Sequence, residues 1–367
     1  MSEPLFLRTT IAIIWDFDTT LIPGYMQEPL FRRFEIKSAD FWKEVNALPQ
    51  FYRTGGVKRA ANDTLYLNHL LNYVRDGKLP GLTNKLLRQL GNELEFYPGL
   101  PEFFQKVKDL VSSNAKFATH QITLEHYIVS TGLREMIMGS KIAPYVDDVW
   151  ACEFAEESAS PGFLQKSLFA EAAKEPVICE IAYSLDHTSK TRAIFEINKG
   201  CNKEPQIEVN TNIAQELRRV PFRNMIYIAD GPSDVPCFST VGHFGGRTYA
   251  VYKAKSTREF EKAYGLQKQH RVEAFGEANY EDGSPTAMWI SHAVQDIAER
   301  IVRDRNRMLG DELGKPPGHV TEPEKSPIVA EAVAAAPNFE STKSSVPRKS
   351  PSPTRIASSP ESATESS

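Results

Sequence analysis

The stretch IAIIWDFDTT, residues 11–20, decides the fold that we expect for this chain. Its first five residues are all apolar, which is typical of a β-strand buried on both faces of a parallel sheet. Asp16 and Asp18 follow where this strand should end, and in an extended chain both side chains point to the same side. Paired carboxylates can divide the work of a nucleophile and a proton donor. The alternative interpretation is an Asx turn at the end of the strand.

Two more apolar runs end in polar residues. Residues 126–129 (HYIV) lead into residues 130–132 (STG), which offer hydroxyl and backbone N–H groups to an anionic oxygen. Residues 225–229 (MIYIA) lead into Asp230 and Asp234, a spacing suited to a hard cation. Alone, the first group is also typical of a helix N-cap and the second of a turn. Open parallel sheets gather ligands at the carboxyl ends of their strands, so we expect all these groups to meet there.

Lys190 supplies the positive charge that such a cluster of acids needs. It opens a helix-patterned segment, residues 190–199, which should stop at Gly200. A lysine in the first turn of a helix opposes the helix dipole, which favours a functional role over a solvated position. Lys199 lies in the last turn, where a cation is stabilising, so we do not assign it to the site.

In this order the four groups resemble the motifs of the haloacid dehalogenase (HAD) superfamily, in its phosphatase branch. The resemblance covers about residues 11–251 and favours the phosphoserine-phosphatase type, which has a helical cap after the first motif. It implies an α/β fold with a Rossmann-like, three-layer parallel sheet core and an inserted α-helical cap. It also implies Mg²⁺-dependent hydrolysis of a small phosphate monoester through an aspartyl-phosphate. Thr19 and Ala229 stand where the superfamily often has glycine, and neither removes a reactive group.

The resemblance implies a role for each residue of the motifs. Asp16 would attack phosphorus, Asp18 would protonate the leaving alcohol and then activate water, and Lys190 would neutralise charge. The groups that would hold the loop and the transferring phosphoryl group belong to Thr20, Ser130, Thr131 and Gly132. Mg²⁺ would be held by the Asp16 carboxylate, the Asp18 backbone carbonyl and Asp230. Asp234 would support the metal site from behind.

Two residues bear on the reaction and the substrate. Asp18 favours a phosphatase over a dehalogenase, because dehalogenases of this superfamily lack that acid. Tyr25 stands where similar phosphoserine phosphatases place a substrate-binding Glu, so phosphoserine itself is not supported. The cap also contains basic residues that could bind an anionic substrate. The alternative is that they are solvated residues on the helix surface. They are Arg32, Arg33, Arg53, Lys58 and Arg59.

The composition and the pattern of apolar residues divide the chain into three parts. We expect residues 1–23 and 97–314 to form the catalytic core, and residues 24–96, with helical patterns broken by Pro and Gly, to form the cap. Residues 315–367 contain 11 Ser, 9 Pro and one aromatic residue, which predicts a disordered tail. This tail could bind a partner or be modified by a proline-directed kinase at Ser326, Ser350, Ser352 and Ser359, each followed by Pro.

Composition excludes several classes of partner. The 367 residues carry 43 Lys+Arg and 47 Asp+Glu, a net charge of −4, which offers no basic field for nucleic acid. No run of 18 apolar residues predicts a membrane span, and the N-terminus does not fit a signal peptide. The four cysteines lack metal or redox spacing, which favours reduced thiols and a cytoplasmic location. A helix with one apolar face, expected over residues 284–308, is compatible with a monomer and with a homodimer.

Three other functions stay open at this point. The phosphoryl group of the aspartyl-phosphate could pass to another acceptor, as in a phosphotransferase, or come from a phosphoprotein. A catalytically silent HAD-fold regulatory protein is the third. A cap over the site argues against protein substrates. So many acidic groups in one place would be costly in a protein without catalysis, which argues against the silent alternative.

Overall fold

The computed structural model describes residues 6–159, 161–163 and 176–312. The segment 315–367, which the sequence predicts to be a disordered tail with kinase sites, lies outside the described residues. Within the described ranges, no helix is both long enough and apolar enough to cross a membrane.

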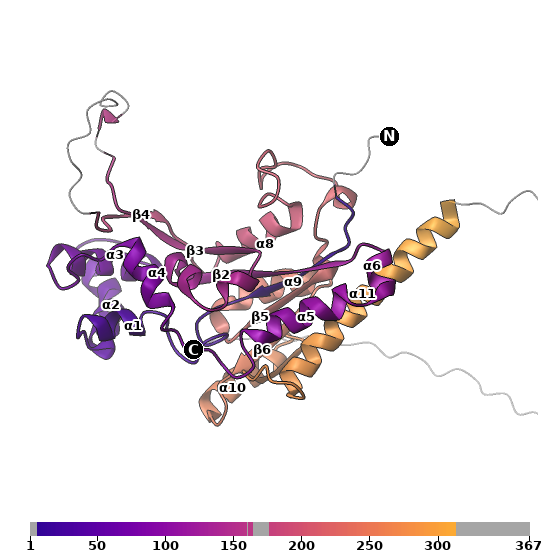
Figure 1. The fold of residues 1–367 in the computed structure, drawn as a ribbon. Coiled ribbons are helices and arrows are strands. Elements are labelled where there is room, and N and C mark those ends of the chain that lie inside the picture. The colour runs from indigo at the N-terminus through magenta and orange to yellow at the C-terminus, as the bar shows by residue number, and fades with distance from the viewer. Residues whose placement is uncertain (1–5, 160, 164–175, 313–367) are drawn as a thin grey trace, which may run out of the picture. The chain divides into compact units, whose positions relative to one another are not determined.

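A seven-stranded sheet forms the centre of the fold (Figure 1). The strands lie in the order β4-β3-β2-β1-β5-β6-β7, and all neighbours are parallel except the antiparallel pair β3 and β4. This confirms the expected α/β fold with a mostly parallel sheet. The strands are β1 (Thr10–Trp15), β2 (Thr123–Leu133), β3 (Asp148–Ala155), β4 (Glu180–Tyr183), β5 (Met225–Ala229), β6 (Arg247–Tyr252) and β7 (Ala274–Glu277).

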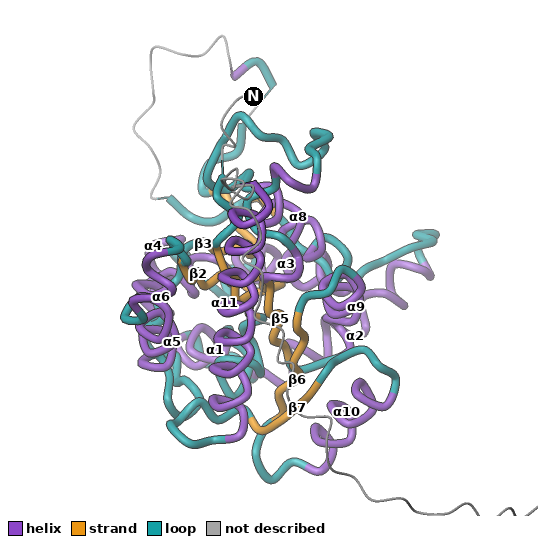
Figure 2. Tube along the Cα trace, turned by 90° about the vertical axis from the view of Figure 1, so that its right-hand side faces the viewer, coloured by secondary structure: helices purple, strands orange, loops and turns teal. Residues whose placement is uncertain are grey.

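Helices cover both faces of this sheet (Figure 2). On one face α5, α6 and α11 contact one another, and α5 and α11 contact β2 and β1; on the other, α8 contacts β2 and α9 contacts β5. The helices are α1 (Glu28–Arg33), α2 (Ser38–Thr54), α3 (Asn62–Arg75), α4 (Asn84–Gly91), α5 (Glu102–Ser112), α6 (Ala115–Thr119), α7 (Arg134–Gly139), α8 (Lys190–Lys199), α9 (Val235–His243), α10 (Thr257–Lys268) and α11 (Pro285–Glu312). Short 3₁₀ turns occupy Ala143–Tyr145, Gln215–Leu217, Phe222–Asn224 and Pro232–Asp234.

The elements begin and end where their residues favour it. Every residue of β1 and β5 is buried, as continuous apolar runs predict for central parallel strands. Gly200 ends α8 in the left-handed conformation (φ 88°), which glycine adopts at little cost. The Thr83 hydroxyl accepts a hydrogen bond from Leu86 N at 2.9 Å and so caps the start of α4. In these elements the observed boundaries agree with the local signals of the sequence.

Strand β2 is longer than the sequence predicts. It continues through residues 130–132 to Leu133, with a register shift against β3 between Val129 and Leu133. The helix N-cap reading of this segment is therefore wrong: Leu133 occupies the N-cap of α7, and no side chain caps that helix. The polar motif is held in irregular extended chain, so its backbone groups are not consumed by a helix.

The last helix of residues 24–96 touches the core backbone to backbone. A Cβ atom added to Gly91 in α4 would overlap the Met136 carbonyl of α7, and one added to Gly139 in α7 would overlap the Arg88 carbonyl of α4. Glycines at both contacts let the two helices approach this closely. Since α7 directly follows β2, α4 is fixed to the strand that carries the polar motif.

Candidate active site

The site lies where the sheet changes direction. From β1 the chain adds β2, β3 and β4 on one side, then returns to place β5 against the other side of β1. The carboxyl ends of such neighbouring strands form a crevice, because their following loops depart in opposite directions. Asp16 follows β1 and Asp230 follows β5, so the two acidic motifs open into this crevice.

Lys190 lies at the centre of the acidic groups. Its Nζ is 2.7 Å from Asp16 Oδ1 and 2.8 Å from Asp234 Oδ1, and its side chain is 2% exposed. Asp16 and Lys190 are 174 positions apart in the chain, so only the fold brings them together. Charge-assisted hydrogen bonds of this length, away from water, fix both carboxylates.

Asp234 is held by donors on several sides. Besides Lys190, its carboxylate accepts hydrogen bonds from the Tyr227 hydroxyl at 2.6 Å and from the Ser233 hydroxyl at 2.9 Å. It is fully buried and does not line the cavity described below. Its oxygens are therefore engaged in orienting the lysine rather than free to face a ligand.

Asp18 is oriented by the loop that follows it. Its Oδ1 accepts a hydrogen bond from Met26 N at 2.9 Å. Thr19 has a φ of 56°, the left-handed region, which explains why glycine suits this position, and its hydroxyl donates to the Asp18 carbonyl at 2.7 Å. Met26 also reaches the second motif, because its Sδ accepts from Leu133 N at 3.0 Å. A Cβ on Gly132 would overlap the end of the Met26 side chain.

The second motif lines the cavity with Ser130, Thr131 and Gly132. Ser130 is buried and its Oγ accepts a hydrogen bond from Gly132 N at 3.0 Å. The Thr131 carbonyl accepts from the Tyr66 hydroxyl at 2.6 Å, which links α3 to this segment. Thr20 lies behind, with Oγ1 3.5 Å from Asp16 Oδ2, while its carbonyl accepts from the Tyr280 hydroxyl at 2.7 Å. Thr20 therefore supports the first loop and does not line the cavity.

Burial dominates the electrostatics of the cluster. It raises the pKa of Asp16 to about 7, an effect that the Lys190 charge opposes and the neighbouring aspartates increase. Burial and then the Asp16 charge raise the pKa of Asp18 well above its usual range, and burial and Asp234 raise the pKa of Asp230. For Lys190, burial favours the neutral form, yet Asp16 and Asp234 outweigh it and raise the pKa. The acids repel one another and have too little positive charge nearby.

This arrangement fits a hard divalent cation. One oxygen from each of Asp16, Asp230 and Asp234 lies within 4.8 Å of the other two. The Asp234 oxygens are occupied as described, so Asp16 and Asp230 are the better placed ligands. Mg²⁺ favours one or two carboxylates, with waters and substrate oxygens completing its shell. A cation here would offset the charge that Lys190 leaves uncompensated.

A cavity of about 350 Å³ joins the motifs to helices α2 and α3. The sequence-predicted residues that line it are Asp16, Asp18, Ser130, Thr131, Gly132, Lys190 and Asp230. The basic residues suggested for an anionic substrate, Arg32, Arg33, Arg53, Lys58 and Arg59, are absent from the described lining, and all are exposed. Arg32 instead forms a surface ion pair with Glu93 at 2.8 Å. The interpretation of these residues as solvated is the one that fits.

Sequence reasoning missed four residues of the site. Tyr227 and Met26 orient the acids, Tyr66 holds the second motif, and Lys262 in α10 lies 3.9 Å from Asp230. Tyr227 offered a weak signal, since its hydroxyl in an otherwise apolar strand needs a buried partner. Met26, Tyr66 and Lys262 lie in segments whose approach to the motifs depends on tertiary packing, and the sequence carries no local sign of it.

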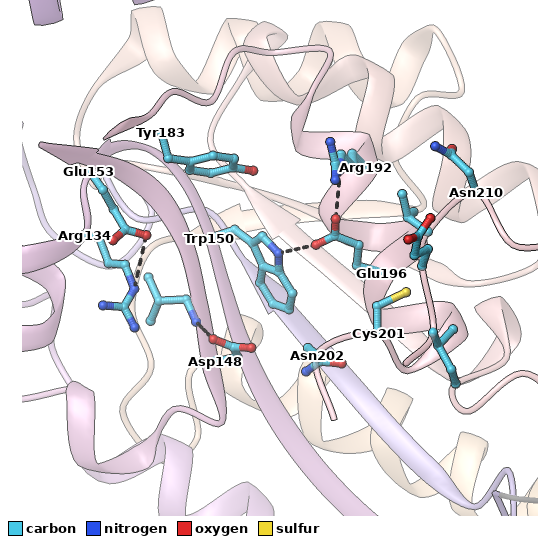
Figure 3. A pocket seen from close by; sticks show the side chains of 14 residues that line it. Arg134, Asp148, Trp150, Glu153, Tyr183, Arg192, Glu196, Cys201, Asn202 and Asn210 are labelled. Carbon is cyan, nitrogen blue, oxygen red and sulfur yellow. Dashed lines mark hydrogen bonds and ion pairs between the residues drawn. The ribbon is translucent and has the colours of Figure 1, made fainter. Parts of the chain in front are cut away.

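A second, larger cavity of about 700 Å³ lies over β3, α8 and the loop that follows α8 (Figure 3). Several of its polar groups are paired: Glu196 accepts from Trp150 Nε1 at 2.7 Å and from Arg192 Nε at 2.8 Å. Arg134 lies 3.9 Å from Glu153. None of the aspartates of the motifs lines this cavity, so we place the chemistry in the smaller one.

Comparison with known proteins gives one close relative. No protein-family model matches the chain. An uncharacterized protein from Borreliella burgdorferi is 39% identical over 288 residues, covering 77% of this chain and 96% of that protein.

Solved structures give distant similarities. A HAD family hydrolase from Salmonella enterica serovar Typhi is 15% identical over 75% of this chain and 68% of its own, with a TM-score of 0.42. A phosphoserine phosphatase with a phospho-aspartyl intermediate analogue is 12% identical, covering 73% of this chain and 93% of its own, with a TM-score of 0.39. A dehalogenase with an intermediate complex is 14% identical, covering 77% of this chain and 96% of its own, with a TM-score of 0.35. At TM-scores below 0.5, none of these superpositions carries a functional conclusion.

The four motifs, whose order resembles that of the haloacid dehalogenase superfamily, meet at one carboxyl edge of a parallel sheet. Their convergence around Lys190 distinguishes this site from the edge of an ordinary parallel sheet. The chain belongs to the same family as the uncharacterized Borreliella burgdorferi protein.

Proposed function

We propose that this protein is a Mg²⁺-dependent phosphomonoesterase that hydrolyses a small phosphorylated metabolite through an aspartyl-phosphate. The observation that carries the proposal is the contact of Lys190 with Asp16 and Asp234 beside a cavity that Asp16, Asp18, Ser130, Lys190 and Asp230 line. Phosphoryl transfer depends mainly on positioning and on neutralising charge, and this site offers both.

The chain's own residues divide the work as follows. Asp16 attacks phosphorus, the bond from phosphorus to the ester oxygen breaks, and Asp18 gives its proton to the leaving alcohol. Asp18 then takes a proton from water, whose oxygen displaces Asp16 from phosphorus and releases inorganic phosphate. Ser130 and the backbone amides of residues 131–132 bind phosphoryl oxygens. Held by Asp16, the Asp18 carbonyl and Asp230, Mg²⁺ would supply further neutralising charge.

The raised pKa of Asp18 suits this assignment. Burial and the neighbouring Asp16 charge raise the pKa of Asp18, which favours the protonated carboxyl that can donate to a leaving oxygen. The contact with Met26 N leaves one carboxyl oxygen free to face the substrate. Thr20, which lies behind Asp16, supports the loop and so has an indirect role in binding phosphate.

The cavity also bears on the alternative functions. A volume of about 350 Å³ beneath α2 and α3 suits a small ester better than a folded phosphoprotein. We therefore place phosphoprotein phosphatase activity and phosphotransfer second. A cytoplasmic location is part of the proposal, supported by four cysteines that are all free thiols.

The test is an assay of purified protein on p-nitrophenyl phosphate and a panel of metabolite monoesters, with Mg²⁺ or with EDTA. We expect Asp16→Asn to lower kcat by on the order of 10³ or more, because the nucleophile is lost. Asp282→Asn is the matched control: this aspartate is 79% exposed and pairs with Lys106 at the surface, so its substitution should leave kcat unchanged.

The outcomes separate the alternatives. Activity that survives Asp16→Asn or EDTA would overturn the mechanism. Recovery of a phosphorylated acceptor, when an alcohol is added to the assay, would assign transfer instead of hydrolysis. No turnover on the whole panel would favour the silent regulatory protein.

A further inference from the structure

Two helices turn one face each toward the phosphate site. Apart from one adjacent pair in each helix, the residues that α2 and α3 contribute to the cavity are three or four positions apart, so each set lies on one side of its helix. They are Trp42, Val45 and Asn46 from α2, and Asn62, Asp63 and Tyr66 from α3. Tyr25 and Gln27, from the loop after β1, complete this wall. These eight residues, the cap wall, surround the space for the alcohol part of a substrate.

Aromatic rings form a row along the cap wall. The ring centroids of Trp42 and Tyr66 are 5.8 Å apart, and those of Trp42 and Tyr25 are 5.5 Å apart, with the rings tilted by 42° and 44°. The Tyr66 hydroxyl donates to the Thr131 carbonyl, so the row begins beside the phosphate-binding segment. Tyr25, at the other end, is 53% exposed and marks the mouth. Faces of aromatic rings attract cations through their quadrupole.

The charges of the wall favour the same kind of ligand. Asp63 is the one carboxylate that the cap wall contributes, and within the described residues 24–96 no lysine or arginine lines the cavity. Both lysines in the lining are at the phosphate end, Lys190 on Asp16 and Lys262 near Asp230. A second anionic group on the substrate would therefore meet no lysine or arginine at the cap end. A positive group would meet Asp63, which lies 3.5 Å from the His187 ring, also in the lining.

Two buried polar atoms of the wall have no hydrogen-bond partner within the described part of the chain. They are Gln27 Oε1 and Trp42 Nε1, and Gln27 is only 2% exposed. Leaving such atoms without a partner is costly, and both are enclosed by protein in this structure. If the wall shifts on binding, Gln27 Oε1 could accept from an N–H or O–H of a substrate, and Trp42 Nε1 could donate to one of its oxygens.

We propose that the substrate is the phosphate ester of a small alcohol that carries an ammonium group and no carboxylate, with the ammonium held by the aromatic row and Asp63. This inference rests on the proposed function and adds the class of its leaving group. It also explains why Tyr25, and not a glutamate, stands after the first motif: an aromatic face and a distant carboxylate suit a bulky alkylated ammonium. Phosphoserine, which carries a carboxylate, would lack a partner for it.

The experiment compares phosphocholine with 3,3-dimethylbutyl phosphate, its neutral isostere in which carbon replaces nitrogen. We expect kcat/KM to be roughly ten-fold or more higher for phosphocholine, since a desolvated cation–π contact is lost in the isostere. Phosphoethanolamine tests whether the alkyl groups matter, and phosphoserine and 3-phosphoglycerate test for an anionic leaving group.

Variants then locate the preference in the structure. Trp42→Leu and Asp63→Asn should each reduce the ratio of kcat/KM for phosphocholine to that for the isostere by several-fold. Because both rates come from the same preparation, any loss of folded protein cancels from the ratio. Phe51→Leu is the matched control, an aromatic residue of α2 that is 70% exposed and outside the lining; its ratio should equal that of the wild type.

The results separate this inference from the function on which it rests. Mg²⁺-dependent hydrolysis of p-nitrophenyl phosphate without preference for phosphocholine over its isostere, or with preference for the carboxylate esters, overturns the inference and leaves the phosphatase standing. A ratio that Trp42→Leu and Asp63→Asn leave unchanged overturns it too. Failure on every ester, p-nitrophenyl phosphate included, overturns the proposed function and the inference together.

Discussion

His126 lies fully buried in β2, and both of its ring nitrogens have partners. Trp15 Nε1 donates to Nδ1 at 3.2 Å, so the proton must sit on Nε2, which donates to the Phe104 carbonyl at 3.0 Å. The Phe104 ring stacks on the imidazole with centroids 4.2 Å apart. A second proton would have to bind Nδ1 and would break the hydrogen bond from Trp15. Burial lowers the pKa of His126 to about 3.

This histidine should make stability depend on pH. Its pKa is lower in the folded than in the unfolded state, so the unfolded state binds the proton first as pH falls below about 6.5. His126 should therefore cost up to about 1.4 kcal/mol of unfolding free energy per pH unit between about pH 6 and pH 3. Urea unfolding at pH 7 and pH 5 measures this.

The variants isolate that contribution. His126→Gln keeps a donor and an acceptor but cannot be protonated, so it should flatten the loss of stability between pH 7 and pH 5. His292→Gln, at an exposed position of α11, is the control and should keep the wild-type slope. An unchanged slope in His126→Gln would contradict the prediction.

At the scale of residues, the sequence predicts the candidate reactive groups better than the side chains that hold them in place. Asp16, Asp18 and Asp230 are visible in the sequence because each follows an apolar run, and Lys190 because it sits at an unfavourable end of a helix. The convergence of these groups in one cavity agrees with that reading, while their catalytic roles stay predictions. Met26 and Tyr66 could not be found this way, since their contacts with the motifs exist only after the chain has packed.

Among the elements, the crossing of α4 and α7 depends on two glycines. The added Cβ of an alanine at position 139 would overlap the Arg88 carbonyl, and backbone atoms cannot rotate out of the way as a side chain can. We expect Gly139→Ala to lower the free energy of unfolding by about 2 kcal/mol or more, measured by urea unfolding.

Gly265→Ala provides the opposite case. This glycine lies inside α10 with nothing within 4 Å of an added Cβ, so alanine should stabilise the protein by about 0.5–1 kcal/mol through helix propensity. If both substitutions had the same small effect, the close contact of α4 and α7 would not exist in solution.

The sequence predicts some of the strands and helices and not others. Strands β1 and β5 follow from continuous apolar runs, and α8 from Gly200 at its end. The extension of β2 through its polar motif was not predictable, because pairing with β3 supplies what the residue types do not. Strand β4 is short and half-exposed, and only its antiparallel pairing with β3 makes it a strand.

The folded protein as a whole buries several acidic side chains close together. Four aspartates surround a single buried lysine, and burial raises the pKa of three of them. A ligand that binds only the folded state stabilises it by mass action. We therefore expect Mg²⁺ at about 100 times its Kd to raise the free energy of unfolding by about 2.7 kcal/mol relative to EDTA.

Thermal unfolding with Mg²⁺ or EDTA measures this as an upward shift of Tm by a few degrees. Asp230→Asn should abolish most of the shift, whereas Asp282→Asn, at the surface, should retain it. Equal Tm values with Mg²⁺ and EDTA for the wild-type chain would argue against a metal at this site.

The close crossing of α4 and α7 also restricts how substrate can enter. With α4 anchored to the core, any opening of the wall formed by α2 and α3 must bend the chain before Asn84. Gly77 and Gly81 lie there with φ of 71° and 65° and no atom within 4 Å of an added Cβ, so this link has the room and the torsional freedom of a hinge. Access to the cavity would then depend on α2 and α3 moving about this link, while α4 stays fixed to α7.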